Sequence, residues 1–285
     1  MTSMKVLTRR AARQAVDRLG HRTASRRALP TMLIAGGQRC GTSTLFRALS
    51  SHPSFVGPTM RKGVHYFDLN FDKPLTWYRA HFPTKSALES VQHRTGSPAV
   101  VGESSPYYMW HPLAPDRIAR SLPGVRVIVL LRDPVERAYS AHAHELARGF
   151  ETEPFEKALT LEAERLQGQE EGLESGELTH SQAYQHLAYV RRGEYITQVE
   201  RLAAAVGKDN LLVLDSADFW AEPDQHWPEV ATFLGLSDHP VSIAQHNARS
   251  RSPMSDQLRA QLQDHYTPFD ERLARWWGRT PSWRR

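Results

Sequence analysis

The feature that most constrains the fold is a short apolar run that ends in two glycines and is followed at once by a helical pattern. Residues 31–35 read Thr-Met-Leu-Ile-Ala, and Gly36 and Gly37 follow them. Leucines at positions 45 and 49 then recur at helical spacing, up to His52. A short apolar run that enters a glycine turn indicates a buried parallel strand. Strand, glycine turn and helix in this order begin a nucleotide-binding α/β unit.

Three later runs predict further strands of the same kind, over residues 99–102, 125–131 and 210–214. Segments with helical periodicity separate them, which favours parallel strands covered by helices on both faces. The predicted fold class is therefore α/β, with a P-loop-like central parallel sheet flanked by helices. Residues 145–177 are rich in Glu, Gly and Gln. They predict a helix followed by a mobile excursion, which is either a solvated insert or a lid over the acceptor site.

Charge is distributed unevenly along the chain. Residues 1–30 hold eight Lys or Arg and one acid, so the remaining 28 basic and 30 acidic residues nearly cancel. We expect a basic N-terminal segment over 1–30, helical or mobile, followed by one domain over 31–285. The nearly neutral body argues against nucleic acid as a partner.

Neither a membrane span nor a secretory signal is expected, because no run approaches about 20 apolar residues and no apolar segment follows the basic head. The chain has one cysteine, Cys40. A single cysteine allows neither an intramolecular disulfide nor a multi-cysteine metal site, and it fits a cytoplasmic location.

The turn after the first strand is a predicted anion site. Its glycines let the backbone approach a ligand, the hydroxyls at 42–44 are donors, and the next helix begins with unpaired N–H groups. A Walker A loop needs a lysine directly after its second glycine. Thr42 occupies that position and the cation lies instead at Arg39, which disfavours a nucleotide kinase or NTPase. A cysteine phosphatase is also disfavoured, because six residues rather than five separate Cys40 from Arg47, so this cysteine is interpreted as a small residue packed in the turn.

A second anion site is predicted at the end of the strand over 125–131. Asp133 and Pro134 are typical of an N-cap and a first helical residue. Arg132 therefore lies at the carboxyl end of a parallel strand, where such sheets bind their ligands. Ser140 lies about two turns into the helix, and an arginine and a hydroxyl can together bind a phosphate monoester.

The two motifs together resemble the nucleotide-binding motifs of sulfotransferases that use 3′-phosphoadenosine-5′-phosphosulfate (PAPS). They read GQRCGTSTL over 37–45 and LRDPVERAYS over 131–140, and the similarity continues through 102–107 and 193–201 to the Trp-rich C-terminus. The resemblance covers about residues 30–283 and implies an enzyme of the glycan-type or bacterial sulfotransferases. It implies that the first motif holds the 5′-phosphosulfate and the second the 3′-phosphate. The implied donor-binding residues are Gln38, Arg39, Cys40, Gly41, Thr42, Ser43, Thr44, Arg132 and Ser140, with Arg249 and Arg251 of a late basic loop, for which a plain basic loop is the alternative.

The segment over 61–68 resembles the part of glycan-type sulfotransferases that carries a catalytic glutamate two residues before a histidine. In this chain the glutamate position is Gly63. His65 becomes the candidate general base, since its reference pKa is near neutral, and Asp68 is its candidate polarising partner. Glu103, at the end of the next strand, is the alternative base.

The remaining cations have candidate roles near the leaving group. Arg39, with Thr42 and Ser43, is expected to stabilise charge on the leaving phosphate. Lys62 either bridges to the sulfuryl group or is solvated, and both readings stay open.

The resemblance implies in-line transfer of a sulfuryl group to a hydroxyl or amine of a carbohydrate, glycolipid or small metabolite, without a metal. The second product is adenosine 3′,5′-bisphosphate. Because the glutamate is missing, a catalytically silent nucleotide-binding protein is an alternative. No pattern identifies the acceptor, small molecule or glycan, or the oligomeric state.

Overall fold

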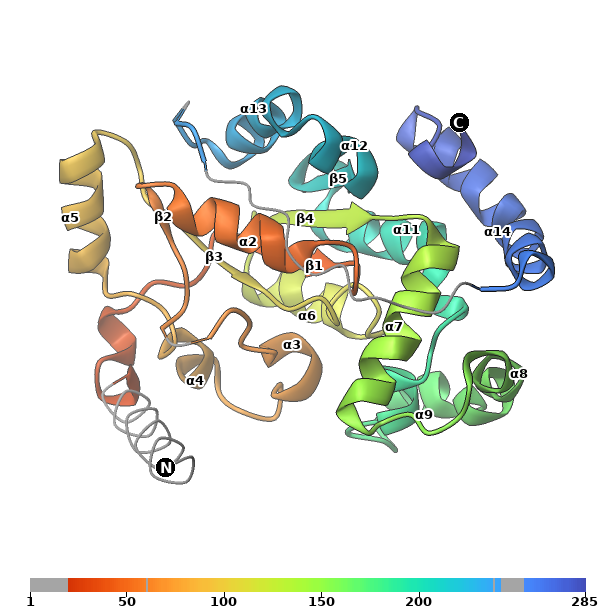
Figure 1. Ribbon diagram of the computed structural model, residues 1–285. Coiled ribbons are helices and arrows are strands. Elements are labelled where there is room, and N and C mark those ends of the chain that lie inside the picture. Colours follow the sequence, from red (N-terminus) through yellow and green to blue (C-terminus); the bar gives the residue numbers. More distant parts are fainter. Residues whose placement is uncertain (1–19, 60, 238, 242–253) are drawn as a thin grey trace, which may run out of the picture.

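The computed structural model describes residues 20–59, 61–237, 239–241 and 254–285 (Figure 1). Five strands form one sheet in the order β2-β3-β1-β4-β5, and every neighbouring pair is parallel. The strands are β1 (Met32–Gly36), β2 (Phe55–Val56), β3 (Val100–Ser104), β4 (Arg126–Leu131) and β5 (Leu211–Asp215). The four longer strands confirm the predicted runs within one or two residues. The two-residue edge strand β2 was not predicted.

Helices cover both faces of this sheet, as the sequence predicted (Figure 1). The α-helices are α2 (Thr42–Ser51), α3 (Tyr66–Leu69), α4 (Leu75–Arg79), α5 (Lys85–Thr95), α6 (Ala114–Ser121), α7 (Pro134–Arg148), α8 (Phe155–Leu166), α9 (Gln169–Ser175), α10 (Gln182–His186), α11 (Tyr195–Val206), α12 (Ser216–Ala221), α13 (Pro223–Leu234) and α14 (Asp256–Trp277). The part of the chain that the structure describes also has four short 3₁₀ turns: η1 (Ala24–Arg26), η2 (Arg191–Gly193), η3 (Lys208–Asn210) and η4 (Ser282–Arg284).

Alternate strand residues build two separate cores. Leu33 of β1 belongs to the same buried cluster as Val199 of α11, on one face of the sheet. Its neighbour Ile34 packs with Leu45 of α2 on the other. Because successive side chains of a strand point to opposite faces, one continuous apolar run serves both cores.

The chain changes direction across the sheet between β1 and β4. After β1 it adds β2 and β3 on one side, and it then crosses to place β4 on the other side of β1. Ligands of open α/β sheets bind at such a switch point, outside the carboxyl ends of the strands. The loops that follow β1 and β4 are the two predicted anion sites, so the topology brings them to the same edge.

The prediction for residues 145–177 was wrong in one respect. Where a mobile excursion was predicted, the structure has the helices α8 and α9. Phe155, Ala158 and Leu166 of α8 are buried. Glu162 of the same helix accepts hydrogen bonds from the backbone N–H groups of residues 189–191. A buried carboxylate anchors this segment where the apolar pattern is sparse.

The end of the basic N-terminal segment lies against the rest of the chain. The backbone of Arg27 pairs with Thr84, and Ala28 donates its N–H to the carbonyl of Pro83 at 3.0 Å. Residues 1–19 lie outside the described part, and the division of the chain at residue 30 stays a prediction. Of the helices described, none is long and apolar enough to span a membrane.

Candidate active site

The loop between β1 and α2 turns through two left-handed residues. Arg39 has a φ of 69° and Gly41 a φ of 94°. A side chain at Gly41 would meet the indole of Trp220, with a Cβ only 2.6 Å from Nε1. Glycine is therefore required here both by its φ and by the approach of the indole. The tight turn leaves the first N–H groups of α2 at the loop, where they favour an anion.

Cys40 fixes this loop to the interior. Its side chain is 1% exposed, and its carbonyl accepts a hydrogen bond from Ser216 Oγ at 2.8 Å. Burial raises the pKa of the thiol, although the charges of Arg137 and Arg132 oppose the shift. A buried thiol with a raised pKa is a poor nucleophile, which agrees with the interpretation of Cys40 as a packing residue.

The two sequence motifs meet in the structure. Arg39 Nε donates to Ser140 Oγ of α7 at 3.1 Å, across 101 residues of sequence. Arg132, which directly follows β4, has its carbonyl held by the hydroxyl of Tyr195 at 2.8 Å. Its guanidinium lies 3.7 Å from the Glu136 carboxylate and is partly exposed. The first motif thus reaches the residues expected to bind a second phosphate.

The start of α7 is capped as predicted. Asp133 accepts hydrogen bonds from the N–H groups of Val135 and Glu136, and Pro134 occupies the first helical position. This cap fixes the direction in which α7 leaves the sheet, and with it the position of Ser140.

Lys62 lies over the start of α2. Its ammonium donates to Ser43 Oγ at 3.0 Å and to Thr42 Oγ1 at 3.4 Å. Burial, followed by the charge of Arg47, lowers the pKa of Lys62 to about 8. Lys62 therefore contacts the start of α2 and is not fully solvated, and its bridging to the sulfuryl group stays a prediction.

Gln38 points into the protein. Its amide nitrogen donates to Glu145 Oε1 at 3.1 Å, and its amide oxygen accepts from Arg192 Nη1 at 2.5 Å. The Gln38 side chain therefore anchors the loop to the protein interior. The backbone of Gln38 is the part of this residue that can contact a ligand. Thr42 and Thr44 are buried at the start of α2.

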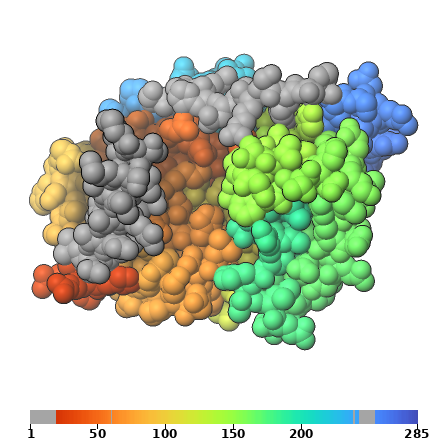
Figure 2. Space-filling view, turned by 60° about the horizontal axis from the view of Figure 1, so that its bottom comes forward, coloured from red at the N-terminus to blue at the C-terminus, as the bar shows by residue number. Residues whose placement is uncertain are grey.

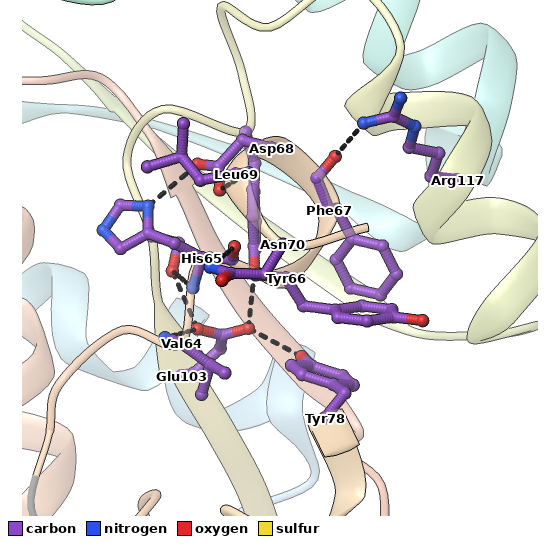
Figure 3. A network of polar contacts seen from close by, with 12 residues as sticks. Val64, His65, Tyr66, Phe67, Asp68, Leu69, Asn70, Tyr78, Glu103 and Arg117 are labelled. Atoms are coloured by element: carbon purple, nitrogen blue, oxygen red, sulfur yellow. Dashed lines mark hydrogen bonds and ion pairs between the residues drawn. The ribbon is translucent and has the colours of Figure 1, made fainter. Parts of the chain in front are cut away.

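His65 and Asp68 form a hydrogen-bonded pair at 2.8 Å between Nδ1 and Oδ2 (Figure 3). Asp68 is buried, whereas the His65 side chain is 37% exposed, which leaves Nε2 for an acceptor. Burial lowers the pKa of His65, but the hydrogen bond and charge of Asp68 and the charge of Glu103 outweigh it and set that pKa above its ordinary value. Figure 2 shows the segment around these residues, in orange, facing α7, in green, across a recess in the surface.

His65 has left-handed backbone geometry, with a φ of 55°. The conformation is costly for a residue other than glycine and must be held by its surroundings. Ser105 Oγ accepts the N–H of His65 at 3.1 Å, and Tyr108 accepts the N–H of Tyr66 at 2.8 Å. Both hydroxyls in turn donate to Glu103.

Glu103 is the centre of this network (Figure 3). It is 0% exposed and accepts four hydrogen bonds: from Val64 N–H at 2.5 Å, Tyr78 at 2.6 Å, Ser105 at 2.8 Å and Tyr108 at 2.8 Å. Burial and the charge of Glu103 raise the pKa of both tyrosines, so they stay protonated and donate. Both carboxylate oxygens are occupied, which suits a residue that positions the His65 segment better than one that removes a proton.

Gly63 is packed too closely for any side chain. A Cβ there would lie 2.7 Å from Ser105 Oγ and closer still to the carbonyl oxygen of Ser104. The same backbone contact is fixed by the Ser104 N–H, which donates to the Lys62 carbonyl at 3.0 Å. The missing glutamate is thus accompanied by a local backbone arrangement that has no room for it.

Two of the predicted residues cannot be placed, and two residues of the hydrogen-bond network were not predicted. Arg249 and Arg251 lie outside the described residues. The hydroxyl donors Tyr78 and Tyr108 were not predicted. Tyr108 ends the Glu-Ser-Ser-Pro-Tyr-Tyr run and could have been suspected from it, whereas no sequence signal marks Tyr78.

Comparison with known proteins decides the family. The protein-family model described as the sulfotransferase domain matches residues 29–267 of this chain. The chain belongs to the sulfotransferase domain family. This is a family of transferase enzymes, and the expected resemblance is confirmed.

Individual relatives of this sulfotransferase domain are distant. The mouse protein named bifunctional heparan sulfate N-deacetylase/N-sulfotransferase 4 is 28% identical over 226 residues, which are 74% of this chain and 23% of that protein. The membrane-associated sulfotransferase kil1 of Dictyostelium discoideum is 31% identical over 114 residues, 40% of this chain and 22% of that protein. The chain therefore spans less than a quarter of the length of these relatives.

A solved structure matches most of this chain. The crystal structure of a sulfotransferase from Alicyclobacillus acidocaldarius is 28% identical, with a TM-score of 0.66. The match covers 90% of this chain and 100% of that one. The predicted parallel α/β fold is thus found in another sulfotransferase.

Proposed function

We propose that this protein transfers a sulfuryl group from PAPS to a hydroxyl or amine of a carbohydrate, a glycolipid or a small metabolite. The observation that carries the proposal is the hydrogen bond between Arg39 and Ser140. It joins the loop after β1 to the helix after β4, which supports two neighbouring anion-binding groups at one edge of the sheet. A nucleotide with phosphates at both its 5′ and 3′ positions fits such a pair of sites.

The donor would be bound at its two charged ends. The phosphate-loop backbone from Gln38 to Thr44, with Arg39, would hold the 5′-phosphosulfate, and Arg132 and Ser140 the 3′-phosphate. Arginine at position 39 keeps the positive charge of the family's usual lysine but presents a fork of donors. Arg249 and Arg251 are further candidates for covering the nucleotide.

Transfer requires charge stabilisation on the leaving phosphate. The acceptor oxygen or nitrogen forms a bond to sulfur while the bond from sulfur to the phosphate oxygen breaks, and that oxygen gains negative charge. The Lys62 ammonium donates hydrogen bonds to the hydroxyls of Thr42 and Ser43, at the loop proposed to hold this phosphate. Lys62, Arg39 and the two hydroxyls are therefore the proposed electrostatic stabilisers.

The acceptor also loses a proton, and we assign it to His65 Nε2. Asp68 holds Nδ1 and so fixes the orientation of the ring and stabilises its charged form. Glu103 keeps the His65 segment in place through Ser105 and Tyr108. A cytoplasmic location, for which the single cysteine is the support, remains part of the proposal.

The function is tested by incubating the protein with isotope-labelled PAPS and a panel of sugars, glycolipids and small hydroxylated or amino metabolites. We expect at least one acceptor to gain the mass of one sulfuryl group, with one adenosine 3′,5′-bisphosphate released per transfer. The same panel with labelled ATP is the control for a kinase. Phosphate transfer from ATP, or binding of PAPS without transfer to any compound of the panel, would contradict the proposal.

A further inference from the structure

Two arginines lie in the interior directly behind the phosphate loop. Arg137 of α7 is 1% exposed and Arg192 of η2 is 4% exposed. Arginine is almost never buried to this extent unless an opposite charge accompanies it. The partners of these two side chains therefore need to be accounted for.

Neither guanidinium has a carboxylate within 4.0 Å in the described part of the chain. Arg137 Nη2 donates to the carbonyl of Tyr189, and Arg192 Nη1 donates to the amide oxygen of Gln38. The Arg192 guanidinium also lies over the rings of Tyr107, at 5.1 Å, and Trp110, at 5.6 Å. These partners are neutral groups, so the two positive charges remain unbalanced at close range.

The nearest acids, Glu145 and Glu162, act on Arg192 and Arg137 through charge, but their oxygens accept hydrogen bonds from other groups. Glu145 accepts hydrogen bonds from Gln38, Arg148 and His186. Glu162 accepts the backbone N–H groups of residues 189–191. Burial, with the charge of Arg137 in the same direction, lowers the pKa of Arg192 to about 10, which still leaves it charged at neutral pH.

Three N–H groups of this pair have no acceptor. Among the described residues, Arg137 Nε, Arg137 Nη1 and Arg192 Nε are buried and have no acceptor in hydrogen-bond geometry, although the Tyr266 hydroxyl lies close to the Arg137 guanidinium. An unsatisfied buried donor is costly, and more so when it carries charge. A bound water or ion is one of the ways in which native proteins satisfy such groups.

Both side chains line one small cavity. It lies between Gly37 and Gln38 of the phosphate loop and Trp110, Tyr195 and Gln198. Its volume is about 10 Å³, room for one particle of about the size of a water molecule.

We propose that this cavity binds a single small inorganic anion, of which chloride is the abundant example. The cavity has room for a single small particle, three donors lack an acceptor, and in the described part of the chain two positive charges converge without a carboxylate within 4.0 Å. A water molecule could accept some of these hydrogen bonds, but Glu145 and Glu162, which act on Arg192 and Arg137 through charge alone, would remain the nearest opposite charges. The bound anion would hold Arg192, which in turn holds Gln38 and the phosphate loop.

The proposal is tested on the unmodified protein by crystallising it with sodium bromide in place of chloride. Data collected at the bromine absorption edge should show an anomalous peak in the cavity, beside Arg137 and Arg192. A peak without anomalous signal would identify a water molecule, and an empty cavity would show no ligand at all. Either of these two results overturns the proposal.

A measurement in solution uses two neighbouring arginines. At constant ionic strength, replacing gluconate by chloride should raise the Tm of the wild type by about 2–4 °C at concentrations well above Kd. Arg192→Met should lose this rise. The control Arg191→Met, at an exposed side chain paired with Glu170, should keep it. Equal chloride effects in both variants would contradict the assignment, and neither arm depends on the proposed sulfuryl transfer.

Discussion

Replacing His65 by alanine is expected to reduce kcat by a factor of about 10²–10⁴, the usual contribution of a general base. The affinity for adenosine 3′,5′-bisphosphate should stay the same, because the phosphate loop and Arg132 are untouched. Turnover with PAPS and calorimetry with the bisphosphate measure the two effects separately. His93→Ala, on the exposed face of α5, is the matched control and should retain full activity. Unchanged turnover in His65→Ala would remove this residue from the mechanism.

The same base predicts a pH dependence whose sign follows from its surroundings. His65 must be neutral to accept a proton, so kcat/KM should rise with pH through a pKa above the ordinary histidine value. Asp68→Asn removes a charge that raises this pKa, so the rising limb should move to lower pH. A rising limb that stays in place in Asp68→Asn would contradict the assignment of that limb to His65.

Replacing Lys62 by methionine is expected to reduce kcat by a factor of about 10²–10³, comparable to the loss of one preorganised donor at a developing charge. The ammonium lies on Ser43 and Thr42, at the loop proposed to hold the leaving phosphate. Because the pKa of Lys62 is lowered to about 8, kcat/KM of the free enzyme should fall as pH rises through that value. Lys62→Arg keeps the charge and should recover part of the activity while abolishing the falling limb.

The control for this variant is Lys85→Met, at an exposed lysine that begins α5. It should have wild-type kcat and an unchanged pH profile. Wild-type turnover in Lys62→Met would show that this lysine only packs against the loop.

Much of the fold could be predicted because it depends on local patterns. The apolar runs of β1, β3, β4 and β5 and the glycine turn before α2 are each contained in a few consecutive residues. The strand β2 was missed because two residues at a sheet edge carry no periodicity. The helix α8 was missed in part because Glu162, a buried carboxylate, takes the place of an apolar anchor.

Only those parts of the candidate site that lie within one short stretch of sequence could be predicted. The phosphate loop, Arg132 and His65 are recognisable within short motifs, and so is the absence of a glutamate at position 63. The reason for that absence is tertiary, because the backbone of Ser104 occupies the space. The network that holds His65 joins Glu103 to Val64 and Tyr78, across 39 and 25 residues, which no local pattern reveals.

The central claim is that one nucleotide is held at both of its phosphates, and calorimetry tests it most directly. Adenosine 3′,5′-bisphosphate and 5′-AMP are titrated into the wild type, Arg132→Ala and the control Arg126→Ala, an exposed residue at the opposite end of β4. A charge-assisted contact to the 3′-phosphate is worth about 1.5–3 kcal/mol, or about 10–100-fold in Kd. We predict that the bisphosphate binds the wild type and Arg126→Ala tighter than 5′-AMP by this factor, and that Arg132→Ala removes most of the difference. Equal affinity of the wild type for both nucleotides, or an equal loss for both in Arg132→Ala, would contradict the account.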